Sequence, residues 1–108
     1  MSIAKATINA GVCGFVTNVT ATCANGQNVS FTVASPCEKI QALGAALPMV
    51  DAFAEIGAGF DGQVLSTVRT HLGGCCAGCV VPAGVFKAMQ VAAKLALPAP
   101  AGVQLERT

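Results

Sequence analysis

The sequence predicts an α+β fold, in which a small antiparallel sheet of about three strands is followed by three to four helices packed on one face. Two observations predict it. In the first third of the chain, apolar and polar residues alternate with a period of two, as in strands with one covered face. From residue 35 onward, apolar residues recur every three to four positions, as in amphipathic helices. Strands first and helices after favour α+β over a parallel α/β sheet.

Three alternating runs are the expected strands. They cover residues 4–9, 19–23 and 29–33, and a glycine-bounded segment at 11–14 separates the first two. Asn25 and Gly26, between the second and third runs, are typical of a tight hairpin turn. Residues 1–34 are therefore expected to form a β-meander.

Residues 35–97 are expected to be helical, within a single domain of residues 1–108. Ser35-Pro36-Cys37-Glu38 has the features of a helix start: a serine cap, a proline in the first helical position and a glutamate that closes a capping box. Pro48 either kinks this helix or begins a second one, which glycines at 57 and 59 end. Further helices are expected over 63–72 and from Pro82 to Pro98, before a loosely held tail at 98–108. The residues expected to face inward are Ile40, Leu43, Leu47, Val50, Phe53, Ala54, Val64, Leu65, Val68, Leu72, Val85, Phe86, Met89, Ala92, Ala93 and Ala96.

The composition excludes several classes of protein. Apolar residues make up 54% of the chain and aromatic residues only 5%, which predicts a thin core where helices approach on small residues. The formal charge of +1 gives no basic surface for nucleic acid or anionic lipid. The uncharged runs are broken by Gly and Pro and are shorter than the about 20 residues that span a bilayer. No signal peptide is evident at the N-terminus, so we expect a cytoplasmic protein without a membrane partner.

Five residues, Cys75 to Cys79, contain three of the six cysteines. In the cytoplasm thiols stay reduced, so these residues suggest ligands or redox groups more than structural disulfides. Cys76 and Cys79 have the C-x-x-C spacing that lets one turn of chain put two sulfurs on one ion or cluster. The same spacing also serves dithiol redox chemistry. Adjacent cysteines usually point apart, so Cys75 is either a spare or a ligand of a multi-metal cluster.

The other cysteines differ in their expected roles. Cys37 falls in the first turn of its expected helix, where free N–H groups, the positive end of the helix dipole and nearby Lys39 favour a thiolate. Cys13 lies in a tight glycine loop with exposed amides. Each of these two is a metal ligand or, alternatively, a small residue that fills space. Cys23 continues the inward phase of its strand and is expected in the core.

Other polar residues give weaker signals. His71 shares an apolar stripe and is expected to be a buried, hydrogen-bonded core residue rather than a ligand. Asp51 and Glu55, one turn apart, and Arg69 are expected to be solvated. The sequence has no Ser–His–Asp pattern, P-loop or dinucleotide-binding fingerprint.

The chain contains several motifs in a recognisable order: Cys13-Gly14-Phe15, Ser35-x-Cys37, Val50-Asp51-Ala52, Glu55-Ile56, Cys79-Val80-Val81-Pro82 and Ala93-x-Leu95-Ala96-Leu97-Pro98. On these motifs, which span nearly the whole chain, it resembles a family of small uncharacterised cysteine-containing proteins from anaerobic archaea and bacteria. The resemblance implies no established activity, but it favours iron–sulfur chemistry. It also implies that histidine often occupies the position of Cys76, an exchange that a ligand position tolerates.

The sequence therefore predicts a binding protein rather than an enzyme. Cys13, Cys37, Cys76 and Cys79, with Cys75 as an alternate or additional ligand, are expected to hold an iron–sulfur cluster of the 4Fe–4S kind or another metal. The role would be electron transfer, or metal or cluster carriage for a larger redox enzyme. The alternatives are structural zinc on the same thiolates, thiol–disulfide exchange by the C-x-x-C pair, and a packing or interaction module, for example one that forms a homodimer.

Overall fold

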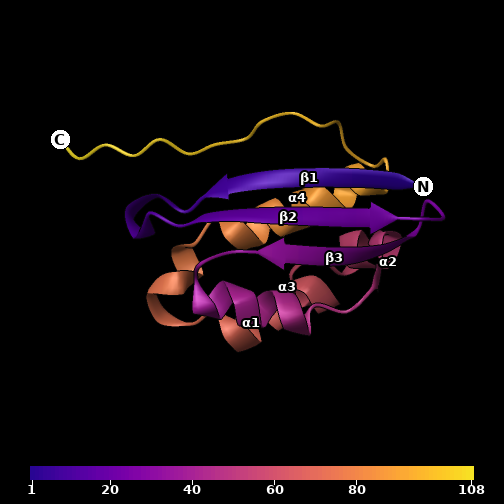
Figure 1. Cartoon of the computed structure of the whole chain (residues 1–108), viewed down its shortest axis with the longest axis horizontal. Helices are drawn as coiled ribbons and strands as arrows, with labels where there is room; N and C mark the ends of the chain where they lie inside the picture. Colours follow the sequence, from indigo (N-terminus) through magenta and orange to yellow (C-terminus); the bar gives the residue numbers. More distant parts are fainter.

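The alternating runs at the start of the chain form three long strands, β1 (Ser2–Asn9), β2 (Val16–Cys23) and β3 (Asn28–Ala34). A computed structural model describes residues 1–108 and confirms the α+β class (Figure 1). A two-residue strand, β4 (Val50–Asp51), completes an antiparallel sheet of order β1-β2-β3-β4. The helices are α1 (Glu38–Ala46), α2 (Ala52–Ala58), α3 (Gln63–His71) and α4 (Val81–Ala92). Short 3₁₀ turns, η1 (Gly11–Cys13), η2 (Gly59–Asp61) and η3 (Gly74–Gly78), lie in three of the connections.

One face of the sheet is covered, as the alternation predicts. Ala4, Ile8, Val19 and Ala21 are buried on it, whereas Ile3, one position out of phase in β1, is 55% exposed. The helix α4 packs along β1 and β2, and α1 packs against β3. The core therefore lies between one face of the sheet and the helices.

The two helices that touch the sheet do so at glycines, which confirms the expected approach on small residues. A Cβ added at Gly44 of α1 would lie 2.6 Å from the Cβ of Val33 in β3. A Cβ added at Gly84 of α4 would lie 2.7 Å from Cγ1 of Ile8 in β1. Real carbon atoms pack at about 3.5–4.0 Å, so Gly44 has room only for hydrogen, and a side chain at Gly84 would require Ile8 to shift.

The helix boundaries differ from the sequence prediction at both ends of the helical part. Cys37, not Ser35, is the N-cap of α1, and Pro36 precedes the helix. Ser35 instead accepts hydrogen bonds from the Cys37 N–H at 3.2 Å and from the Thr17 hydroxyl at 2.9 Å, which hold it against β2. The start of α4 beside Pro82 is confirmed.

The last helix ends at Ala92, six positions before the expected terminator, Pro98. Lys94 adopts a left-handed conformation with φ of 62°, and the Leu95 N–H bonds to the Gln90 carbonyl at 2.8 Å. This is a Schellman ending, which the sequence did not reveal because the left-handed position is usually glycine. Ala96 is therefore exposed rather than inward, as are all side chains from 94 to 108.

The segment after Pro48 also departs from the prediction. Val50 is buried, but in β4, where it pairs with Val29, rather than in a helix. Phe53 and Ala54 of α2 are exposed, so their expected inward placement was wrong. The residues that α2 buries are Ala52 and Glu55.

None of the helices is long and apolar enough to cross a membrane.

Candidate functional site

The chain segments that bear five of the cysteines gather at one end of the molecule. Cys13 lies in η1, between β1 and β2; Cys37 follows β3 at the start of α1; and the segment 75–79 joins α3 to α4. All three segments lie at the same end of the long axis, at the left of Figure 1. Cys23 is at the opposite end of β2, buried to 1% exposure as expected of a core residue. All six cysteines are free thiols.

The thiols of this end differ in their surroundings. Cys37, Cys76 and Cys79 are half-buried and pack against the core, whereas Cys13 and Cys75 are exposed. The sulfur of Cys37 does not cap α1, although its residue occupies the N-cap position. Three partly covered sulfurs and two solvent-facing ones are thus available at the same end.

One contact ties α1 to the cysteine segment. Lys39, in the first turn of α1, donates a hydrogen bond from Nζ to Sγ of Cys76 at 3.6 Å. The two residues are 37 positions apart in sequence. The sequence placed Lys39 near Cys37, and the structure adds Cys76 as its partner.

The thiols do not form a closed ligand set in this conformation. No group of three or more His, Cys, Asp or Glu side chains is arranged so that it could hold a metal ion. The pair that does share one environment is Cys76 and Cys79, which both line the same cavity. The turn η3 brings these two residues together, since the Cys79 N–H bonds to the Cys76 carbonyl at 3.0 Å.

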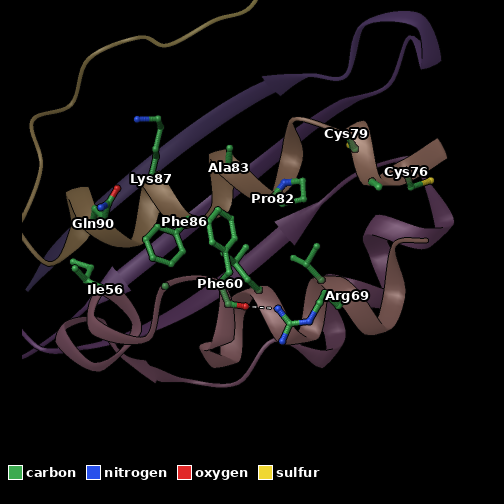
Figure 2. Close-up of a pocket in the computed structure, with 14 residues that line it drawn as sticks. Ile56, Phe60, Arg69, Cys76, Cys79, Pro82, Ala83, Phe86, Lys87 and Gln90 are labelled. Atoms are coloured by element: carbon green, nitrogen blue, oxygen red, sulfur yellow. Dashed lines mark hydrogen bonds between the residues drawn. The ribbon is translucent and has the colours of Figure 1, made fainter. Parts of the chain in front are cut away.

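That cavity is open, mainly apolar and about 820 Å³ in volume. It lies among α2, η2, α3 and α4, on the side of the helices away from the sheet (Figure 2). In this view Cys76 and Cys79 mark one end of it and Ile56 the other. Phe86 contributes to its apolar wall. The size and apolar lining are those of small-molecule sites in proteins.

Glu55 holds the start of α3 in a way that the sequence did not suggest. It was expected to be solvated, yet it is 3% exposed. Its carboxylate accepts hydrogen bonds from the N–H groups of Gln63 at 3.0 Å and Val64 at 2.6 Å. These are free amides at the start of α3, which has no cap in its own sequence because Gly62 stands there. A capping residue eight positions upstream leaves no local sequence pattern.

Asp51 is also structural rather than merely solvated. It caps α2, accepting from the Phe53 N–H at 2.9 Å and the Ala54 N–H at 3.2 Å. The hydrogen bond from the Gln27 side chain, followed by the one from Ala54, lowers the pKa of this carboxyl below its usual value. Asp51 therefore anchors the turn between β2 and β3 to the start of α2.

Two further polar residues singled out from the sequence, His71 and Arg69, lie in α3. The Nδ1 of His71 donates to the Thr67 carbonyl at 2.9 Å, so the expected hydrogen bond is present. The residue is half-buried rather than a buried core residue as expected. Arg69 lines the cavity and donates from Nη1 to the Phe60 carbonyl across it. Arg69 is exposed, as expected, and the structure adds its hydrogen bond and its place in the cavity lining.

Together, these features define a small α+β protein with a thiol-rich end beside an apolar cavity. Residues 4–105 match the model of a family described as "Family of unknown function (DUF6951)", and the chain belongs to that family. This agrees with the expected membership of an uncharacterised family of small proteins. Neither the curated proteins nor the solved structures include a match to the chain.

Proposed function

We propose that the protein binds a thiolate-held metal centre, an iron–sulfur cluster in the first place, at its cysteine-bearing end. One observation carries the proposal: three segments far apart in sequence, bearing Cys13, Cys37 and Cys75 to Cys79, meet at one end of the molecule. Soft thiolate ligands suit iron–sulfur clusters and zinc, and several cysteines from separate loops are their usual setting. The Lys39 ammonium beside Cys76 would offset part of the negative charge.

Metal binding would require the segment 73–79 to move. No three donor side chains are within reach of one ion here, so sulfurs must approach one another. The segment is suited to such movement, because a Cβ at Gly73, Gly74 or Gly78 would meet no atom within 4 Å. Cys13 and Cys75 are exposed and can turn without disturbing the core. A site that closes around its metal couples binding to local ordering.

The proposed role is electron transfer, or metal or cluster carriage for a larger redox enzyme in the cytoplasm. The resemblance to small cysteine-containing proteins of anaerobic organisms supports iron–sulfur chemistry over other metals. Structural zinc on the same thiolates is the alternative metal. Elemental analysis separates the two.

The test is metal and acid-labile sulfide analysis, with an absorption spectrum, on protein purified without oxygen. We expect iron and sulfide in comparable amounts and charge-transfer absorption that disappears in the double variant Cys76→Ser, Cys79→Ser. Cys23→Ala is the matched control, since it removes a sulfur at the opposite end and should leave the metal content unchanged. Protein free of iron under these conditions rejects the cluster, and one tightly held equivalent of zinc favours the structural site instead.

A second candidate, dithiol redox chemistry, has one specific observation in its favour. Cys76 and Cys79 are three residues apart across a 3₁₀ turn, where side chains i and i+3 eclipse, and both residues line the cavity. Oxidation would form one disulfide between them, with two electrons and two protons passing to a partner disulfide, which becomes two thiols. Metal-free protein with a reversible Cys76–Cys79 disulfide, found by thiol titration in a glutathione redox buffer, would promote this function above metal binding.

A further inference from the structure

The charge of the cavity beside Cys76 and Cys79 is one-sided. Nine of its fourteen lining residues are apolar, and its two charged lining residues, Arg69 and Lys87, are both cationic. No Asp or Glu lines it. Arg69 donates one hydrogen bond, to the Phe60 carbonyl, which leaves further donors on a group that has five. An apolar groove with cations and no carboxylate is complementary to a ligand with an apolar body and a negative group.

Two large apolar side chains that line the cavity are also exposed to water. Phe60 is 82% exposed and Ile56 is 42% exposed, both on the segment that follows β4. A ligand that covers these side chains would remove their apolar surface from water, at about 25 cal/mol per Å². Lys87 extends from the α4 side, opposite Arg69 (Figure 2).

We propose that this cavity binds a small anionic amphiphile of the medium-chain carboxylate kind. Its hydrocarbon chain would lie against Val68 and Phe86, along the groove toward Cys79, and its carboxylate would accept hydrogen bonds from Arg69. The long, flexible Lys87 side chain supplies a second positive charge at the opposite margin. This site goes beyond the proposed metal centre and does not depend on it, because the groups invoked here are not sulfurs.

Three ten-carbon probes test the proposal: decanoate, decanol and decyltrimethylammonium, each below its micelle threshold. Binding is followed by amide chemical shifts on isotope-labelled protein under reducing conditions. We expect decanoate to shift the amides of Val68, Ala83 and Phe86 saturably, and to bind roughly tenfold more tightly than decanol, as one hydrogen bond to a charged group allows. The cationic probe should bind least tightly. Equal affinity for all three probes, or no saturable shift with decanoate, overturns the proposal.

Variants locate the site. Ala83 is exposed on α4 and lines the cavity, so Ala83→Phe fills the groove without displacing any buried side chain. Ala42 is exposed on α1 outside the cavity, which makes Ala42→Phe the matched control. Decanoate binding should be lost in the first variant and kept in the second. Unchanged binding in Ala83→Phe refutes the assigned cavity.

The role of the guanidinium is tested separately. Arg69→Gln should weaken decanoate binding roughly tenfold while leaving decanol binding unchanged, and Arg69→Lys should restore much of the loss. Equal weakening of both probes by Arg69→Gln contradicts charge recognition. The Cys76→Ser, Cys79→Ser double variant should still bind decanoate, so failure of the metal proposal and failure of this one have different readouts.

Discussion

Replacing Gly44 by alanine tests whether a missing side chain sets the distance between α1 and the sheet. The added Cβ would lie 2.6 Å from Cβ of Val33 and 3.2 and 3.3 Å from its two methyl carbons. Carbon atoms pack at about 3.5–4.0 Å, so the helix must move by about 1 Å. Rotating Val33 does not relieve the overlap, because the nearest atom is its Cβ. Such overpacking costs about 1–3 kcal/mol.

An opposing effect requires a matched control. Alanine is favoured over glycine in a helix by about 1 kcal/mol, which partly hides the packing cost of Gly44→Ala. Gly57 in α2 has no atom within 4 Å of an added Cβ, so Gly57→Ala gains the helix preference without the overlap. The difference between the two free energies of unfolding therefore isolates the packing cost, and we expect about 1–3 kcal/mol. Urea unfolding followed by far-ultraviolet circular dichroism measures it. If the two variants are equally stable within about 0.5 kcal/mol, the close approach at Gly44 does not set the packing.

Three further outcomes follow from single side chains. Glu55→Gln should lower the free energy of unfolding by about 1–3 kcal/mol, because the amides at the start of α3 lose a charged acceptor. The control Glu106→Gln, in the exposed tail, should change it by less than about 0.5 kcal/mol. Equal effects of the two substitutions in urea unfolding contradict the capping role. The folded-state pKa of Asp51 is below its ordinary 3.8, so its carboxylate stabilises the fold above that pH and loses this effect as the pH falls through the folded pKa. Asp51→Asn should therefore reduce the dependence of stability on pH over this acidic range. An unchanged acid-unfolding profile would contradict the capping role of Asp51. Lys39→Met should slow alkylation of Cys76 by iodoacetamide, because it removes the ammonium group that donates a hydrogen bond to Sγ. The rate is measured by mass spectrometry of the labelled peptide, and an unchanged rate would contradict a role for this contact.

The strands could be predicted from the sequence because their period matches one buried face over five or more residues. Val50 and Asp51 escaped prediction because two residues have no period, and their pairing with Asn28 and Val29 depends on the chain returning from α1. The start of α1 was misplaced for a tertiary reason. Ser35 has the chemistry of a cap, but its hydroxyl oxygen is engaged by Thr17 of the neighbouring strand.

The polar groups near the cavity show what local patterns miss. Glu55 lies one helical turn after Asp51, and on a helical wheel the two acids look like one solvated face. The chain folds back at η2, which brings the start of α3 over Glu55 and turns a surface acid into a buried cap. The apolar cavity was equally hidden, because Leu65 and Val68 lie on the expected inward stripe but face the open groove as well as the core.

The gathering of the cysteines has a topological origin that separates the predictable part from the rest. In an antiparallel meander the connection after β1 and the C-terminal end of β3 lie at the same end of the strands. Cys13 and Cys37 are therefore at one end of the sheet for reasons of topology alone. The segment 75–79 joins them because α4 starts there, with Gly84 against Ile8 near the end of β1. The order of the strands thus predicts that Cys13 and Cys37 share an end, whereas the position of segment 75–79 depends on helix packing. The distances between sulfurs depend on the conformation of a glycine-rich segment with few backbone hydrogen bonds, which strand topology does not determine. Metal content is therefore the decisive measurement on the thiol site.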